Sequence, residues 1–279
     1  MAVKKKRSGK QPQDLGISAK ELYTKLETKR EPYVQRADAC AKLTLPHVFH
    51  DKNDDGNKKF QTPYQSIGAR GVNNLTSKLT LALFPPNEGF FKLGLSSDMK
   101  QQLINASPEA YEQKIQEIEQ ALMRYEQSCM RFMEENQVRI TAQEANRHLV
   151  ITGNGVVFLP PDRDGTKFYD LNHYVVQRDG VGTVVTLITK DVLLKRTLPP
   201  EAINLVPDKK DDEEVEVYTK CDLVDDTYEC FSEVDGVRIA GSEQSYPRDK
   251  FPYIVLRMTK GSNEDYGRSI VEEYLGDLT

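Results

Sequence analysis

The first part of the chain places apolar residues at the spacing of an α-helix. Ser18 and Glu21 form a capping box, which predicts a helix running toward Arg30. Pro32 suits the first turn of a second helix, which ends near Leu45. The sequence therefore opens with two predicted helices, after a polar start.

A third helix is predicted between residues 62 and 86. Thr62 suits the N-cap, Pro63 the first turn and Gln65 the capping box, and two prolines end it. Its apolar face holds Ile67, Val72, Leu75 and Leu79. The small residues Gly68, Ala69 and Gly71 allow close packing, either within the domain or against another subunit. Residues 89–95 are predicted to form a strand.

The longest predicted element covers residues 107–135. Its apolar residues alternate four and three apart, which is a heptad pattern: Tyr111, Ile115, Ile118, Leu122, Tyr125, Cys129 and Phe132. At 1.5 Å per residue the helix is roughly 40 Å long. It is either a long core helix or one that also contacts a neighbouring copy. Thr141 and Glu144 cap a further helix, which ends at Gly153 or Gly155.

After residue 155 the pattern changes to short strand-like runs. Asp179-Gly180 and Asp235-Gly236 separate such runs as hairpin turns. The connection from residue 197 to 214 holds a short helix and an acidic loop. Helices followed by a mostly antiparallel β region, ending in the start of a helix, indicate an α+β fold.

The last residues predict a helix without a stop signal. Ser269 and Glu272 form a capping box, and an apolar stripe follows at Ile270, Val271, Tyr274, Leu275 and Leu278. The stretch carries no C-cap glycine or asparagine, basic last turn or proline before the final residue. We expect the chain to begin this helix without finishing it.

Charge and cysteine content narrow the classes of protein. The net charge is −5, and no apolar run approaches the 18 residues of a membrane span. The basic residues among positions 4–10 form either a solvated tail or a nucleic-acid arm, and no hydrophobic stretch follows that would make a signal peptide. The cysteines lack a paired short spacing, so we interpret them as reduced thiols in a cytosol-like compartment: Cys40, Cys129, Cys221 and Cys230.

Motifs for chemistry are weak. Residues 51–56, "DKNDDG", match the first half of a calcium loop, but Thr62 stands where the chelating Glu belongs. His47, His50 and Asp51 are too few for a zinc site, and His148 and His173 lie in other elements. The "GNG" at 153–155 follows a helix and precedes a strand, the reverse of a nucleotide-binding turn. We expect no catalytic, cofactor or metal site.

Several stretches in this order resemble the portal, or head-to-tail connector, proteins of short-tailed bacteriophages. They include "REPYVQRADACAKLTLP", "QTPYQSIGARGVNNLTSKLTLALFPP", "LVITGNGVVFLP", "YVVQRDG", "YPRDKFPYIVLRM" and "EDYGRSIVEEYLGDL". The resemblance runs from about Leu15 to Leu278. It implies a structural ring, typically dodecameric, at one capsid vertex, through which DNA is packaged and ejected. A stand-alone nucleic-acid-binding module using the basic N-terminal tail is the alternative.

The resemblance also implies a division of the chain. Residues 1–16 would be a disordered basic tail, 17–155 and 156–265 the helical and β-rich parts of the wing, and 266–279 the start of the first stem helix. Glu272, Glu273 and Asp277 would be channel-facing. Implied partners are further copies, double-stranded DNA, capsid, terminase, tail adaptor and internal core proteins. The implied location is the virion, with the host cytoplasm during assembly.

Overall fold

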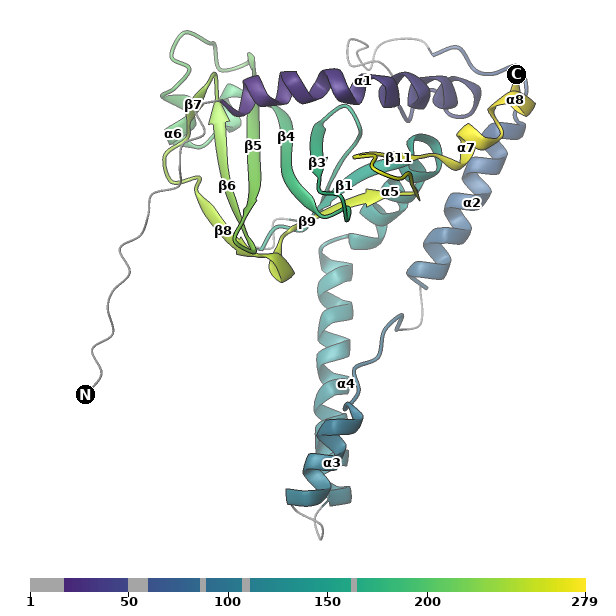
Figure 1. Cartoon of the computed structure of the whole chain (residues 1–279), viewed down its shortest axis with the longest axis vertical. Coiled ribbons are helices and arrows are strands. Elements are labelled where there is room, and N and C mark those ends of the chain that lie inside the picture. Colours follow the sequence, from purple (N-terminus) through teal and green to yellow (C-terminus); the bar gives the residue numbers. More distant parts are fainter. Residues whose placement is uncertain (1–17, 50–59, 86–88, 107–110, 162–164) are drawn as a thin grey trace. The chain divides into compact units, whose positions relative to one another are not determined.

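The computed structural model describes residues 18–49, 60–85, 89–106, 111–161 and 165–279. Their helices are α1 Ala19–Leu43, α2 Ile67–Leu83, α3 Ser97–Ala106, α4 Tyr111–Glu135, α5 Val138–Thr152, α6 Pro200–Ile203, α7 Ile270–Glu273 and α8 Leu275–Leu278 (Figure 1). The longer strands are β1 Asn154–Phe158, β3 Tyr174–Arg178, β4 Val184–Leu194, β5 Glu214–Val224, β6 Thr227–Val234 and β9 Tyr253–Arg257. The shorter ones are β2 Lys167–Tyr169, β7 Val237–Arg238, β8 Gln244–Pro247, β10 Thr259–Lys260 and β11 Gly267–Arg268. The predicted α+β class is confirmed.

The chain divides into two compact units. The first contains residues 18–31 and 173–249, and the second contains the described residues of 32–172 and 250–279. Helix α1 contributes its residues up to Glu31 to the first unit and the remainder to the second.

The first unit is built on an antiparallel six-stranded sheet. Its strand order is β3-β4-β5-β6-β7, with β8 paired to β6. The start of α1 packs on the sheet through a cluster of Ala19, Tyr23, Leu26, Val175, Ile188 and Tyr218. A second cluster joins α6 and its flanking loop to the sheet: Leu198, Ala202, Val206, Val215, Val217, Val234 and Ile239. Alternating strand residues therefore supply the sheet side of both clusters.

Aspartates and glycines make the hairpin turns of this sheet. Asp179 accepts hydrogen bonds through Oδ1 from the backbone N–H groups of residues 181, 182 and 183. Asp235 and Gly236 have φ of 49° and 80°, as a two-residue turn of type I′ requires. Both predicted turns are confirmed. A third turn, at Asp225-Asp226, was not predicted.

Buried polar groups tie α1 to the first unit. The Glu233 carboxylate accepts from the backbone N–H groups of Ala19 at 2.8 Å and Lys20 at 3.2 Å. It therefore caps the N-terminus of α1 from a distant strand, beside the local cap that Ser18 provides to Glu21. The buried Arg30 donates to the Tyr174 carbonyl at 2.7 Å.

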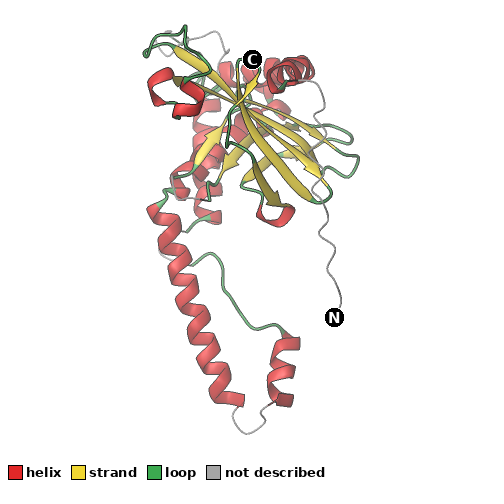
Figure 2. Ribbon diagram, turned by 90° about the vertical axis from the view of Figure 1, so that its left-hand side faces the viewer, coloured by secondary structure: helices red, strands yellow, loops and turns green. Residues whose placement is uncertain are grey.

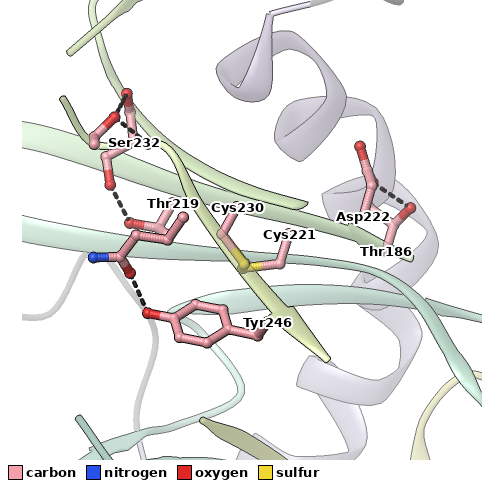
Figure 3. The surroundings of a disulfide bond; sticks show 9 residues. Thr186, Thr219, Cys221, Asp222, Cys230, Ser232 and Tyr246 are labelled. Atoms are coloured by element: carbon pink, nitrogen blue, oxygen red, sulfur yellow. Dashed lines mark hydrogen bonds between the residues drawn. A yellow bond between two sulfur atoms is a disulfide. The ribbon is translucent and has the colours of Figure 1, made fainter. Parts of the chain in front are cut away.

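Two cysteines in the sheet are joined, which corrects the prediction that all four are reduced. Cys221 and Cys230 lie directly opposite each other on β5 and β6 and form a disulfide, with Cα atoms 4.1 Å apart (Figure 3). On the same strand pair Thr219 and Ser232 share a hydrogen bond of 2.9 Å. The hairpin register brings the cysteines together although nine positions separate them, a spacing that the sequence did not mark as a pair. Cys40 and Cys129 are free.

The second unit combines a small sheet with packed helices. Its sheet has the order β2-β1-β9, and β10 and β11 form a separate antiparallel ribbon. Helix α5 packs against α2 and β1. Helix α3 lies beside the N-terminal part of α4 as one arm of a helical hairpin (Figure 2). The long helix was predicted correctly, whereas α3 was not foreseen.

Several predicted helix boundaries were wrong. Helix α1 continues through Pro32, since buried residues anchor it on both sides. Helix α2 begins at Ile67 rather than Thr62, and Ser66 takes the N-cap position without a side-chain capping bond. Helix α5 begins at Val138, which places Thr141 inside it.

The predicted strand at residues 89–95 is not formed. The backbone N–H of Leu93 donates to the Glu126 side chain of α4 instead of to another strand. The rings of Phe84, Phe90 and Phe91 contact one another in edge-to-face pairs. Ring packing and a side-chain acceptor therefore replace the strand pairing that the pattern predicted.

Candidate functional site

The C-terminal segment begins at a capped and buried serine. Ser269 Oγ accepts from the backbone N–H of Glu272 at 2.9 Å, so the predicted N-cap is confirmed. The same oxygen lies 3.6 Å from Cys40 Sγ of α1. Burial raises the pKa of the Cys40 thiol, although its contact with Ser269 acts in the opposite direction. Cys40 is therefore a neutral thiol that contacts the N-cap residue of α7.

The Gly153-Asn154-Gly155 motif holds the chain just before that serine. Asn154 Nδ2 donates to the Gly267 carbonyl at 2.9 Å, and Gly267 N–H donates to Asn154 Oδ1 at 2.6 Å. The amide side chain thus pairs with the backbone as a neighbouring strand would. Asn154 Nδ2 also donates to the Thr152 carbonyl at 2.8 Å. We call these residues, 153–155 with 267–269, the GNG clamp.

The glycines of the clamp have a steric reason. Gly153 ends α5 with φ of 75°, which confirms the predicted helix C-cap. A Cβ added there would lie 2.4 Å from the backbone carbon of Arg268, so no side chain fits. A Cβ on Gly155 would meet the Phe168 ring at 2.5 Å. The glycines of the motif therefore allow close approach of the backbone at Arg268 and of the Phe168 ring.

Ion pairs surround the start of α7. Arg36 Nε lies 3.5 Å from Glu272 Oε1, and Arg268 lies 3.7 Å from the same oxygen. Arg268 also pairs with Glu264 at 2.9 Å, which lowers the pKa of that carboxyl. The Arg36 guanidinium stacks over the Tyr33 ring, 4.5 Å from its centre. The first carboxylate of α7 is therefore partly neutralised by two cations.

The three predicted channel residues differ in their surroundings. Glu272 is half-buried and takes part in the ion pairs described above, whereas Glu273 and Asp277 are exposed. The predicted single helix is broken at Tyr274, which has φ of −110° and separates α7 from α8. Tyr274 is 55% exposed, although the sequence placed it in the apolar stripe. Two carboxylates thus remain as surface charges.

The small residues of α2 also separate into two kinds. A Cβ on Gly68 would lie 2.7 Å from the Leu43 carbonyl and 3.5 Å from Leu278, so this glycine serves packing within the unit. Gly71 is exposed, with nothing within 4 Å of an added Cβ. Close packing within the chain therefore explains Gly68 but not Gly71.

The weak metal motifs lie partly outside the described residues, namely His50 and residues 51–56. Among the residues that are described, no three or more His, Cys, Asp or Glu side chains are grouped as metal ligands would be. His148 is buried and its ring contacts Phe168, with centres 4.7 Å apart. No helix of the described chain has the length and apolar content needed to cross a membrane.

Asn154 is the residue that sequence reasoning missed. The sequence pattern predicts only a helix end here and assigns no role to the asparagine between the glycines. Its signal is chemical: an amide can both donate and accept, so it can pair with backbone where two glycines admit a second segment. The sequence gives no signal that the partner segment of Asn154 is residues 267–269.

Comparison with known proteins accounts for nearly the whole chain. The family model described as "Bacteriophage head to tail connecting protein" matches residues 18–279. The chain is 38% identical over 270 residues to the portal proteins of Escherichia phage T7 and Enterobacteria phage T3, covering 93% of this chain and 49% of each relative. It is 29% identical over 263 residues to the portal protein of Enterobacteria phage SP6, covering 92% of this chain and 50% of that protein. The chain thus spans about half the length of the curated relatives it matches. It belongs to the bacteriophage head-to-tail connecting protein family.

Proposed function

We propose that this chain is part of a structural subunit of a phage portal ring at one capsid vertex. The ring would form the channel for DNA packaging and ejection and the attachment point for the tail. The observation that carries the proposal is the family match over residues 18–279, together with relatives that are portal proteins. None of the comparisons favours the alternative of a nucleic-acid-binding module, and its basic residues 4–10 lie outside the described part of the chain.

Within such a subunit, residues 17–155 and 156–265 would be the helical and β-rich parts of the wing, after a basic tail at 1–16. Residues 266–279 would begin the stem. The GNG clamp supports the last of these boundaries, because Asn154, just after α5, makes two hydrogen bonds with Gly267. A segment fixed at its base can be held at a constant angle in every copy of a ring.

The carboxylates beyond the clamp would face DNA. Beyond the clamp, residues 270–279 hold three carboxylates and no Lys or Arg. Exposed negative charge repels the phosphate backbone and keeps DNA from adhering to a channel wall. Glu273 and Asp277 would act in this way, and Glu272 less so because Arg36 and Arg268 pair with it.

Charge reversal tests that role. In the assembled ring, Glu273→Lys with Asp277→Lys should slow DNA packaging, and the loss should shrink as salt rises. Glu272→Lys would also break two ion pairs, so its effect on folding must be measured separately. Unchanged packaging in the double variant, with intact rings, would exclude these residues from the channel surface.

The proposed partners are further copies of the subunit, the capsid, terminase, tail adaptor and internal core proteins. The rotational symmetry of ring images from electron microscopy would give the number of copies, which we expect to be about a dozen. The proposed location is the virion, with assembly in the host cytoplasm.

Immunogold labelling tests the function directly: an antibody raised against this chain is applied to purified particles of the phage that encodes it. Label at a single vertex is expected. Label spread over the shell, or particles that lack the protein, would contradict the proposal.

A further inference from the structure

Helix α4 exposes the second half of its heptad stripe. The first half, through Leu122, is half-buried where α3 lies alongside. With 10 residues, α3 is much shorter than the 25-residue α4, so it covers only part of the stripe. Beyond it Tyr125 is 66% exposed and Cys129 is exposed as well. No residue of α4 is buried.

Helix α2 carries a second exposed stripe at the same spacing. Its buried face holds Gly68, Val72, Thr76 and Thr80. The opposite face has exposed residues four, three, four and three positions apart: Ile67, Gly71, Asn74, Lys78 and Leu81. Ile67 and Leu81 are 64% and 58% exposed. The stripe therefore carries a large apolar side chain at each end, with the small Gly71 and the polar Asn74 and Lys78 between them.

The two stripes are complementary in charge and in size. Helix α4 has six glutamates and three cations, a net charge of −3, whereas α2 has Arg70 and Lys78 and no acidic residue. The α4 stripe offers the large ring of Tyr125, and the α2 stripe offers open space at Gly71. The opposite net charges of the two helices favour pairing of the two stripes over pairing of either with itself.

We propose that the α4 stripe of one copy docks on the α2 stripe of a second copy of this chain. This proposal rests on the proposed ring function, and it identifies the two helix surfaces through which neighbouring copies would bind. Since the two surfaces differ, a docked pair still has one free α2 stripe and one free α4 stripe. Such a head-to-tail contact builds a ring if the rotation closes, whereas a self-pairing stripe would stop at a dimer.

Cross-linking between Cys129 and an introduced thiol tests the pairing in assembled phage. Particles carrying Asn74→Cys are treated with a short bismaleimide and separated by denaturing electrophoresis. Lys78→Cys serves as a second variant should the first fail to assemble. Asn73→Cys is the matched control, because Asn73 is exposed on the same helix but points about 100° away from the stripe.

We expect a ladder of dimers, trimers and larger species for Asn74→Cys or Lys78→Cys, with a linked peptide joining position 74 or 78 to Cys129. The ladder should vanish on adding Cys129→Ser, and Asn73→Cys should give at most a tenth of it. Absence of a ladder in both stripe variants would overturn the proposal, as would dimers alone in the unsubstituted protein, which would show α4 paired with itself. Single-vertex labelling is unaffected by either result, so the proposed function is judged separately.

Discussion

Replacing Asn154 with Ala should release the GNG clamp. The side chain is only 1% exposed and makes three hydrogen bonds: two from Nδ2, to the carbonyls of Thr152 and Gly267, and one to Oδ1, from Gly267 N–H. Alanine makes none of them. The substitution therefore leaves one backbone donor and two acceptors without the amide, in a buried place.

The size of the effect follows from these contacts. A typical hydrogen bond contributes about 1 kcal/mol net, and a buried group left without a partner costs about 1–3 kcal/mol. Three lost bonds with little water access give a loss of about 3–5 kcal/mol in the free energy of unfolding of the second unit. The exposed Asn73→Ala should change it by less than about 0.5 kcal/mol.

An isosteric variant separates hydrogen bonding from shape. Asn154→Asp keeps the acceptor for Gly267 N–H but turns the two donated bonds into contacts between oxygens. Burial and these carbonyls raise the pKa of a carboxyl there, so the folded state takes up a proton more readily than the unfolded state. Stability is then lost as pH rises, and the variant should approach the wild type as pH falls toward 4.

Urea unfolding followed by far-UV circular dichroism measures the global loss. Hydrogen exchange of a peptide that contains residues 264–271 measures it locally, because the Gly267 amide is protected by Asn154. Faster exchange in this peptide is expected for both variants at pH 7. If Asn154→Ala unfolds at the wild-type urea concentration and exchanges at the wild-type rate, the hydrogen bonds of Asn154 do not stabilise the second unit.

Three further outcomes are expected. Reducing the disulfide should lower stability by about 2–3 kcal/mol, since it closes a loop of nine positions; a Cys221→Ala, Cys230→Ala variant should no longer respond to reductant in the same urea titration. Glu233→Ala should destabilise the first unit by about 1–2 kcal/mol, because it removes the acceptor for two N–H groups at the start of α1. Glu233→Gln should recover part of this loss, and equal losses would indicate that charge alone matters. Cys40 should resist alkylation at pH 8.5 while Cys129 reacts, because burial raises the pKa of the Cys40 thiol. The neutral Cys40 thiol should stabilise the folded state at low pH, and this contribution should fall as pH rises past the thiol pKa of the unfolded chain. Thermal unfolding measured between pH 7 and 10 checks this dependence.

Local signals predicted the parts of the fold that depend on neighbours in sequence. The turn at Asp179-Gly180 is predicted from its residue types, and its cause is local, since the Asp179 carboxylate accepts from N–H groups two to four residues on. The end of α5 was predicted because Gly153 tolerates a positive φ. The cap at Ser269 was predicted for a similar reason. Each of these features is decided within about five residues, so the sequence alone contains its cause.

Long-range partners could not be predicted in this way. Pro32 reads as a helix start, but buried residues on either side of it keep α1 continuous. Cys221 and Cys230 become a pair only once the register of β5 and β6 is known. Asn154 acquires its role from Gly267, 113 positions away. In each case a contact between distant residues outweighs the local preference.

The heptad stripe of α4 shows what a hydrophobic pattern does and does not specify. It correctly predicted a long helix, yet the residues it placed inward, such as Tyr125 and Cys129, are exposed in a single chain. The hydrophobic pattern predicts that one face of the helix is buried, but it does not identify the molecule that covers this face. If the proposed ring forms, part of the apolar surface of each copy is buried by the neighbouring copy. The exposed stripes of α4 and α2 are then the surfaces proposed for this contact, and the opposite net charges of the two helices are the reason to look for the partner in the next copy.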